Sequence, residues 1–203
     1  MPNEVPHPEA APTIALIGAT PTAELIAARA LRANLNVIID DISDARLQAT
    51  SIHLRDIVGA QPRCAPGPQE QPASPQSVFS SLDSPVPDAT LPTLHLTQSI
   101  ESAIRQSDFL IDTLPDDLEV KLELFTLFDK FAKPTAIFIT TGSIPIDDLA
   151  EITFCPDRCL AVRLTDTPNS NPAFELIPAK QTSARTLDTC TNLFLHSFAF
   201  REK

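Results

Sequence analysis

The chain has 203 residues, a length that fits one α/β domain with a core of its own. Its formal net charge of −11 opposes nucleic acid binding, because that affinity depends on Lys and Arg neutralising phosphates. No apolar run reaches the length of a membrane-spanning helix, and the four cysteines lack the spacing of a zinc site. We therefore expect a cytoplasmic protein with no metal, no membrane contact and no nucleic acid partner.

Strand-like and helix-like segments alternate along the chain. Apolar, β-branched runs predict strands at 13–17, 37–41, 93–97, 108–113, 135–140, 159–164 and 174–177. Apolar residues at helical spacing predict helices at 23–33, 43–58, 99–106, 118–131, 146–152 and 182–194. This alternation predicts an α/β, Rossmann-like fold with a mainly parallel sheet and helices on both faces.

Two proline-rich segments interrupt the pattern. Residues 1–12 contain four prolines and are expected to form a flexible tail before a domain at 13–203. Prolines also recur through 61–92, where no regular helix can pass, so we expect an irregular insert inside the domain. The alternative for this insert is a docking peptide, although it lacks a P-x-x-P motif with basic flanks.

The first strand runs into a turn that resembles a dinucleotide-binding G-x-G-x-x-G turn with most of its glycines replaced. The three glycine positions hold Gly18, Thr20 and Ala23. Gly18 can make the bend, and Ala23 is small enough for the helix to pack on the strand. Thr20 crowds the place where phosphate oxygens need room, and Pro21 removes a backbone N–H that would bind them. The turn therefore predicts the fold better than it predicts tight phosphate binding.

An acidic residue follows the glycine turn at the distance typical of ribose recognition. Asp41, with Asp40 beside it, ends the second predicted strand about twenty positions after Gly18, where such folds bind the ribose hydroxyls. The alternative is that these acids form a solvated strand end that caps the next helix.

Further motifs occur in a recognisable order. They are Gly18-Ala19, Asp41-Ile42-Ser43, SDFLID at 107–112, LEVKLELF at 118–125, TTGSI at 140–144 and FELI at 174–177. In this order the chain resembles the NAD-binding domain of the 3-hydroxyacyl-CoA dehydrogenases over about residues 13–195. The resemblance implies NAD as cofactor, an oxidoreductase activity in fatty acid metabolism, and a C-terminal helical domain that we expect this chain to lack.

The resemblance also implies roles for individual residues toward the cofactor. Asp41 matches the acid that binds the adenosine ribose. Asp116 and Lys121 match the acid and the lysine that face the nicotinamide half. With Gly18, Thr20 and Ala23, these residues form the expected cofactor site, and we expect NAD to bind weakly if it binds.

The catalytic positions of the family are altered here. The family uses a His–Glu dyad, in which the Glu matches Glu175 and the His falls on Arg163. Arginine stays charged near pH 7 and cannot act as a general base. The substrate-contacting serine of the family falls on Gly142, with Ser143 next to it.

These departures lead to three hypotheses. The first is a non-dehydrogenase nucleotide-binding, sensing or interaction module. The second is weak binding of NAD or another adenosine ligand, with weak or altered NAD-dependent oxidoreductase activity. The third is a changed reaction in which Glu175 acts as the base and Arg163 binds a carboxylate of the substrate. The alternative to this third hypothesis is that Arg163 and Glu175 form an ion pair without a catalytic role. We also expect a homo-oligomer or a protein partner at the surface that the helical domain covers in relatives.

Overall fold

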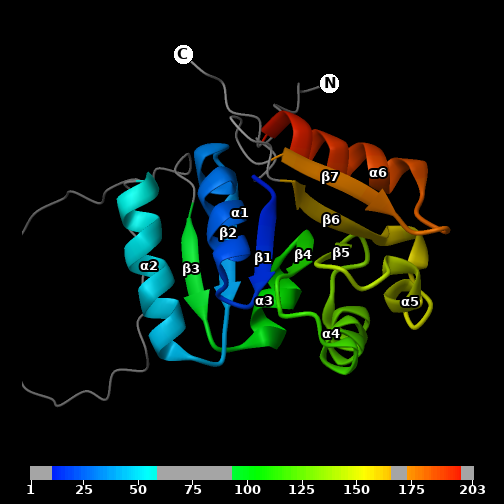
Figure 1. Cartoon of the computed structure of the whole chain (residues 1–203), viewed down its shortest axis with the longest axis horizontal. Coiled ribbons are helices and arrows are strands. Elements are labelled where there is room, and N and C mark those ends of the chain that lie inside the picture. The colour runs from blue at the N-terminus through cyan, green and yellow to red at the C-terminus, as the bar shows by residue number, and fades with distance from the viewer. Residues whose placement is uncertain (1–10, 59–92, 166–172, 198–203) are drawn as a thin grey trace, which may run out of the picture.

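The computed structural model describes residues 11–58, 93–165 and 173–197. The expected tail, except for residues 11 and 12, and the whole expected insert at 61–92 lie outside the described residues. Within the described part, strands and helices alternate as the sequence predicts (Figure 1).

The sheet has seven strands in the order β3-β2-β1-β4-β5-β6-β7. The strands are β1 (Thr13–Ile17), β2 (Asn36–Asp40), β3 (Leu94–Thr97), β4 (Phe109–Asp112), β5 (Ile137–Thr141), β6 (Cys159–Thr165) and β7 (Ala173–Pro178). All neighbours pair in parallel except β7, which is antiparallel to β6. The first six strands follow the spatial order 3-2-1-4-5-6 of doubly wound dinucleotide-binding folds.

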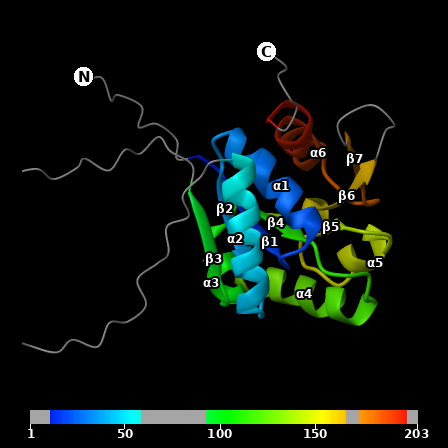
Figure 2. The same cartoon turned by 60° about the vertical axis from the view of Figure 1, so that its left-hand side comes forward.

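Helices cover both faces of this sheet, as expected. The α-helices are α1 (Pro21–Arg32), α2 (Asp44–Val58), α3 (Ile100–Gln106), α4 (Leu118–Phe131), α5 (Ile146–Ala150) and α6 (Ala184–Thr191). One core joins the sheet to α1, α2 and α6, and a second core joins its other face to α3, α4 and α5. Figure 2 shows α1 and α2 in front of the strands, with α4 running along the opposite side.

Several helix bounds differ by one to three residues from the sequence prediction, and the first and the last helix are the instructive cases. The first helix begins at Pro21 and not at Ala23, because Thr20 caps it and proline is well suited to the first helical position. The closing helix, predicted to run from 182 to 194, is α-helical only from Ala184 to Thr191 and continues as a π-helix over Asn192–Ser197.

Three phenylalanines form the centre of the second core. Phe125 and Phe128 of α4 and Phe138 of β5 are fully buried, with ring centroids 5.4 to 6.3 Å apart. These spacings suit tilted and edge-on aromatic packing. Phe125 and Phe128 of the predicted helix at 118–131 are therefore core residues, as the sequence indicates, whereas Leu118 at its start is exposed.

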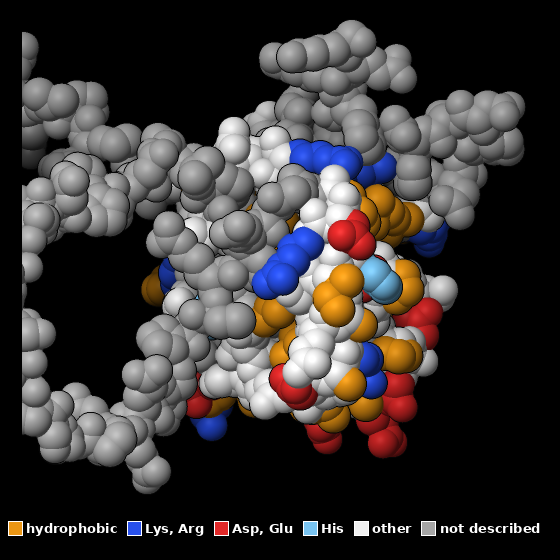
Figure 3. Space-filling view, turned by 90° about the vertical axis from the view of Figure 1, so that its left-hand side faces the viewer, with side chains coloured by type: hydrophobic (Ala, Val, Ile, Leu, Met, Phe, Trp, Pro, Cys, Tyr) orange, Lys and Arg blue, Asp and Glu red, His pale blue; other side chains and the backbone are white. Residues whose placement is uncertain are grey.

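The described surface mixes apolar and charged side chains. On the face shown in Figure 3, hydrophobic side chains lie between acidic and basic ones outside the grey atoms. Ile52 and Ile57 of α2 are among the exposed hydrophobic residues. Among the described helices, none is long and apolar enough to cross a membrane.

The aromatic cluster gives a direct test of the fold. Phe128→Ala should lower the free energy of unfolding by about 3 to 5 kcal/mol, because it opens a cavity in a fully buried cluster. Phe154→Ala is the matched control, since Phe154 is 98% exposed and its loss should change stability by less than about 0.5 kcal/mol. Urea unfolding measures both, and equal effects would contradict the assigned core.

Candidate functional site

A cleft of about 410 Å³ opens at the carboxyl ends of the parallel strands. Its walls come from the β1–α1 turn, the segment after β4, the end of β5 and the middle of β6. The lining residues are Thr20, Thr22, Thr113, Leu114, Pro115, Asp116, Thr141, Gly142, Ser143, Val162, Arg163 and Leu164. Ligands of open α/β sheets bind at this edge, so the cleft is the candidate functional site.

The turn at Gly18 needs a glycine for two reasons. Its φ of +103° lies in the region that side-chain-bearing residues avoid, and an added Cβ would come within 2.9 Å of Leu114. Thr113 stabilises the turn, since its hydroxyl lies 2.9 Å from the Ile17 carbonyl oxygen and 2.7 Å from that of Gly18, and its one proton is shared between these two acceptors. Gly18 therefore makes the bend that the sequence indicates.

Thr20 occupies the start of α1 with its own side chain. Its Oγ1 accepts a hydrogen bond from the Ala23 N–H at 3.2 Å, and its backbone N–H donates to the Gly18 carbonyl. Ala23 is fully buried against the core, as expected for the third position of the turn. Because these amides already have partners and Pro21 has no N–H, the helix start offers a phosphate fewer donors than a glycine-rich turn does.

Asp41 lies beside this turn, but its carboxylate is fully engaged. Its Oδ2 accepts from the Ala19 N–H at 2.9 Å, and its Oδ1 accepts from the Ser43 N–H at 2.7 Å. Arg46 adds contacts of 2.6 to 3.1 Å from Nε and Nη2 to both oxygens. Burial by itself would raise the pKa of Asp41, but the hydrogen bonds from Arg46, Ser43 and Ala19 outweigh it and hold this pKa below its ordinary value.

Asp40, the neighbour of Asp41, is a buried acid without full hydrogen bonding. It is 5% exposed, and its Oδ1 has no hydrogen-bond partner among the described residues. Burial, followed by the negative charge of Asp41, raises the pKa of Asp40 to about 6. The surroundings therefore raise the pKa of Asp40, the last residue of β2, and lower the pKa of Asp41, which follows it.

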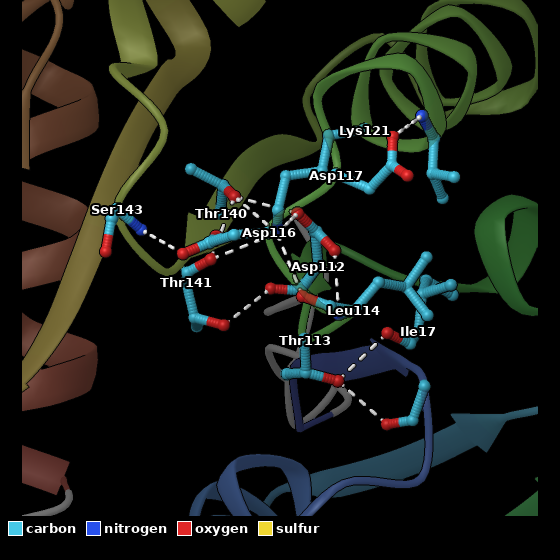
Figure 4. Close-up of polar contacts among 12 residues, drawn as sticks. Ile17, Asp112, Thr113, Leu114, Asp116, Asp117, Lys121, Thr140, Thr141 and Ser143 are labelled. Atoms are coloured by element: carbon cyan, nitrogen blue, oxygen red, sulfur yellow. Dashed lines mark hydrogen bonds and ion pairs between the residues drawn. The ribbon is translucent and has the colours of Figure 1, made fainter.

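Lys121 lies beneath the cleft and does not line it. Its ammonium group is fully buried and binds Asp112 Oδ2 at 2.6 Å and the carbonyl oxygens of Leu114 and Thr141 at 3.1 Å each (Figure 4). Thr140 donates to the same Asp112 oxygen at 2.7 Å. Burial raises the pKa of Asp112, and the positive charge of Lys121 opposes this shift without cancelling it. The position expected to face the nicotinamide half thus holds a structural ion pair in this conformation.

Asp116 and Gly142 fit together at the floor of the cleft. Gly142 has a φ of +114°, and an added Cβ would overlap the Asp116 carboxylate. Asp116 Oδ2 accepts from the Ser143 N–H at 2.9 Å, and its Oδ1 lies 3.9 Å from the Lys121 ammonium. Asp116 fills the space that a side chain at position 142 would need, so Gly142 and Asp116 form one packing arrangement.

Arg163 and Glu175 face each other across the antiparallel β6–β7 pair. They are register partners, and Arg163 Nη1 lies 3.3 Å from Glu175 Oε2. Both side chains are more than half exposed, and Arg163 also lines the cleft. The two positions of the expected dyad are thus brought together as an ion pair.

Sequence reasoning missed three residues that shape the site. Asp112 and Thr140 hold Lys121 below the cleft, and Arg46 covers Asp41. The sequence did contain an indication that Asp112 has a role, since it is a charged residue at the end of a buried strand. Asp166, which follows the last residue of β6 in the sequence, lies outside the described residues.

The fold and the cleft define a Rossmann-like domain of the dinucleotide-binding type. The sequence matches the family described as 3-hydroxyacyl-CoA dehydrogenase, NAD binding domain, over residues 13–197. The chain therefore belongs to the NAD-binding domain family of the 3-hydroxyacyl-CoA dehydrogenases.

Individual relatives of the chain are also dehydrogenases, and their sequence identity to it is low. A 5-formyl-3-hydroxy-2-methylpyridine 4-carboxylate 5-dehydrogenase of Mesorhizobium japonicum is 23% identical over 89% of this chain and 53% of its own length. An L-carnitine dehydrogenase of Burkholderia mallei is 28% identical over 53% of this chain and 34% of its own length. The chain thus spans between a third and about half of these relatives.

Solved structures show the same fold. A structure of 5-formyl-3-hydroxy-2-methylpyridine 4-carboxylic acid 5-dehydrogenase, described as an NAD+ dependent dismutase, has a TM-score of 0.70 at 22% identity, over 94% of this chain and 56% of that one. The (S)-3-hydroxybutyryl-CoA dehydrogenase of Ralstonia eutropha has a TM-score of 0.69 at 20% identity, over 94% of this chain and 62% of that one. The expected Rossmann-like fold is confirmed.

The buried ion pair below the cleft can be tested by removing its cation. Lys121→Met should lower the free energy of unfolding by about 3 to 5 kcal/mol, because it leaves Asp112 buried without its partner. The double variant Lys121→Met/Asp112→Asn should be milder, since no charge remains buried. Lys133→Met is the control, because its pair with Asp108 is over a third exposed and should contribute less than about 1 kcal/mol. If urea unfolding shows the same loss of stability for Lys133→Met as for Lys121→Met, this assignment is contradicted.

Asp40 should make stability depend on pH. Its pKa is raised on folding to about 6, so the folded state disfavours its ionised form and loses stability as pH rises from about 4 through about 6. Asp40→Asn removes this loss, and its stability gain over the wild type should be about 2 kcal/mol larger at pH 7.5 than at pH 4.5. Asp56→Asn, on the exposed side of α2, is the control. A gain for Asp40→Asn that is the same at both pH values would refute the shift.

Proposed function

We propose that this chain is an adenine-nucleotide-binding module of its family that does not carry out the family's hydride transfer. The observation that carries the proposal is the Arg163–Glu175 ion pair at the wall of the cleft. The sequence resemblance places this pair at the positions of the His–Glu dyad. A guanidinium group holds its proton at pH 7, so Arg163 cannot take a proton from a hydroxyl substrate.

The surroundings of this pair support the same proposal. In relatives a serine hydroxyl is expected near the reacting oxygen, whereas Gly142 offers none and Asp116 brings a carboxylate to the cleft floor. A negative charge there would oppose an alkoxide that develops during hydride transfer. Ser143 keeps a hydroxyl at the cleft, but its backbone N–H is already bound to Asp116.

The residues fit NAD only in part. The open cleft, with its threonine and serine hydroxyls, has a volume in the range of small-molecule sites and suits the nicotinamide half. On the adenosine side, Thr20 takes a helix N–H that a phosphate would use, and Asp41 has no oxygen left for a ribose hydroxyl while Arg46 stays in place. We therefore propose weak binding, since each missing hydrogen bond reduces the affinity by about 1 kcal/mol. A homo-oligomer or a protein partner remains a prediction of the sequence.

The experiment combines a binding assay and a turnover assay on the full chain. Titration with NADH should give a dissociation constant above about 100 μM, and mixing with acetoacetyl-CoA and NADH should give no enzyme-dependent oxidation of NADH. Arg163→His should leave binding of ADP-ribose within about threefold, because Arg163 lies in the cleft proposed for the nicotinamide half, which ADP-ribose lacks.

Two results would contradict the proposal. Turnover by the wild-type chain that Glu175→Gln abolishes would show a working dyad despite Arg163. Calorimetric titration with millimolar NADH and ADP-ribose that gives no heat and no competition would remove the binding role.

A further inference from the structure

We propose that Arg46 selects the class of adenine nucleotide, so that the chain binds ligands with a 2′-phosphate better than ligands with a free 2′-hydroxyl. This inference rests on the proposed nucleotide-binding function and adds the ligand class. It concerns the end of β2, where the acid that would recognise the ribose lies next to the β1–α1 turn.

The Asp41 carboxylate has no acceptor capacity left for a ribose. An ionised carboxylate offers about four lone-pair positions. The five donor contacts on Asp41 come from Ala19, Ser43 and Arg46, at distances of 2.6 to 3.1 Å. Its side chain is 4% exposed, so little of its surface is left for solvent or ligand. A ribose with two free hydroxyls can dock on Asp41 only if Arg46 first leaves it.

Arg46 can bind a phosphate group while it stays bound to Asp41. Its Nε and Nη2 face Asp41, so the Nη1 nitrogen lies on the outer edge of the planar guanidinium group. The side chain is 56% exposed, which makes this outer edge accessible to a ligand. Arginine binds phosphate oxygens through its N–H groups, and dinucleotide-binding folds that accept a 2′-phosphate use an arginine in this region after β2.

The charges around Asp41 and Arg46 also favour binding of a 2′-phosphate. A bare Asp41 carboxylate would repel a 2′-phosphate, but the Arg46 charge neutralises it through a 2.6 Å contact. The start of α2 adds the positive end of a helix dipole, since Arg46 lies in its first turn and its N–H points to the Ser43 hydroxyl at 3.4 Å. Asp44, in the same turn, is the opposing charge, and it is exposed to solvent and bound to Gln48.

The test compares nucleotides that differ only at the 2′ position. The full chain is titrated with adenosine 2′,5′-bisphosphate and with adenosine 5′-monophosphate, and then with NADPH and NADH. In each pair, the wild-type chain should bind the 2′-phosphorylated member about tenfold more tightly, which corresponds to one charge-assisted pair. Arg46→Gln should weaken binding of the 2′-phosphorylated members about tenfold and strengthen binding of the others several-fold, because Asp41 becomes available to the ribose.

Two further variants make the result specific. Arg55→Gln removes the same charge from an exposed position on the same helix and should change neither affinity by more than about twofold. Arg46→Lys keeps the charge but loses the planar fork, and should reduce the preference without reversing it. Unchanged thermal unfolding of Arg46→Gln shows that the effect does not come from misfolding.

The outcomes separate this inference from the function on which it rests. If both members of each pair bind equally, or if Arg46→Gln leaves their ratio unchanged, the role of Arg46 is refuted and nucleotide binding stands. If neither member binds at millimolar concentration, nucleotide binding itself is refuted, and the role of Arg46 with it.

Discussion

The buried ion pair between Lys121 and Asp112 fixes the floor on which the cleft depends. Lys121 belongs to α4, Asp112 ends β4, and Thr140 and Thr141 end β5, so one ammonium group ties three elements at the carboxyl edge of the sheet. Two charges removed from water lose several kcal/mol of hydration each, and only close pairing with further hydrogen bonds offsets that loss. The contacts to Leu114 and Thr141 provide these bonds, and the same two segments form the cleft wall.

The rest of the cleft is also satisfied by its own groups. The amides of the β1–α1 turn bind Asp41 and Thr20, the Asp116 carboxylate binds the Ser143 N–H, and Arg46 neutralises Asp41. Buried polar groups without partners are costly, so this internal bonding stabilises the corner without a ligand. The same bonding leaves fewer donors and acceptors for a dinucleotide, which is the physical basis for the weak affinity that we propose.

Membership in a dehydrogenase family is compatible with the proposed absence of its hydride-transfer reaction. The family defines the fold, whereas chemistry depends on a few side chains with suitable proton affinity. Arg163 forms an ion pair with Glu175, and in the proposed function this arginine stands where the family has its catalytic histidine, so a permanent cation replaces a titratable base. The cleft, the ion pair and the polar floor are the features on which the proposed binding role rests.

The sequence by itself determined the fold and most of its elements, because buried parallel strands are short apolar runs and because Gly18 is required by local backbone conformation. Runs such as Thr13–Ile17 and the helix Leu118–Phe131 could be delimited to the residue, since their patterns depend on neighbours along the chain. Only the tertiary structure showed what the charged residues do. The sequence predicts Lys121 and Asp41 as cofactor contacts, and the structure adds that Lys121 binds Asp112 and that Arg46 binds Asp41. Which charges pair depends on the crossing of strands and helices in three dimensions, and composition and spacing along the chain do not encode those distances.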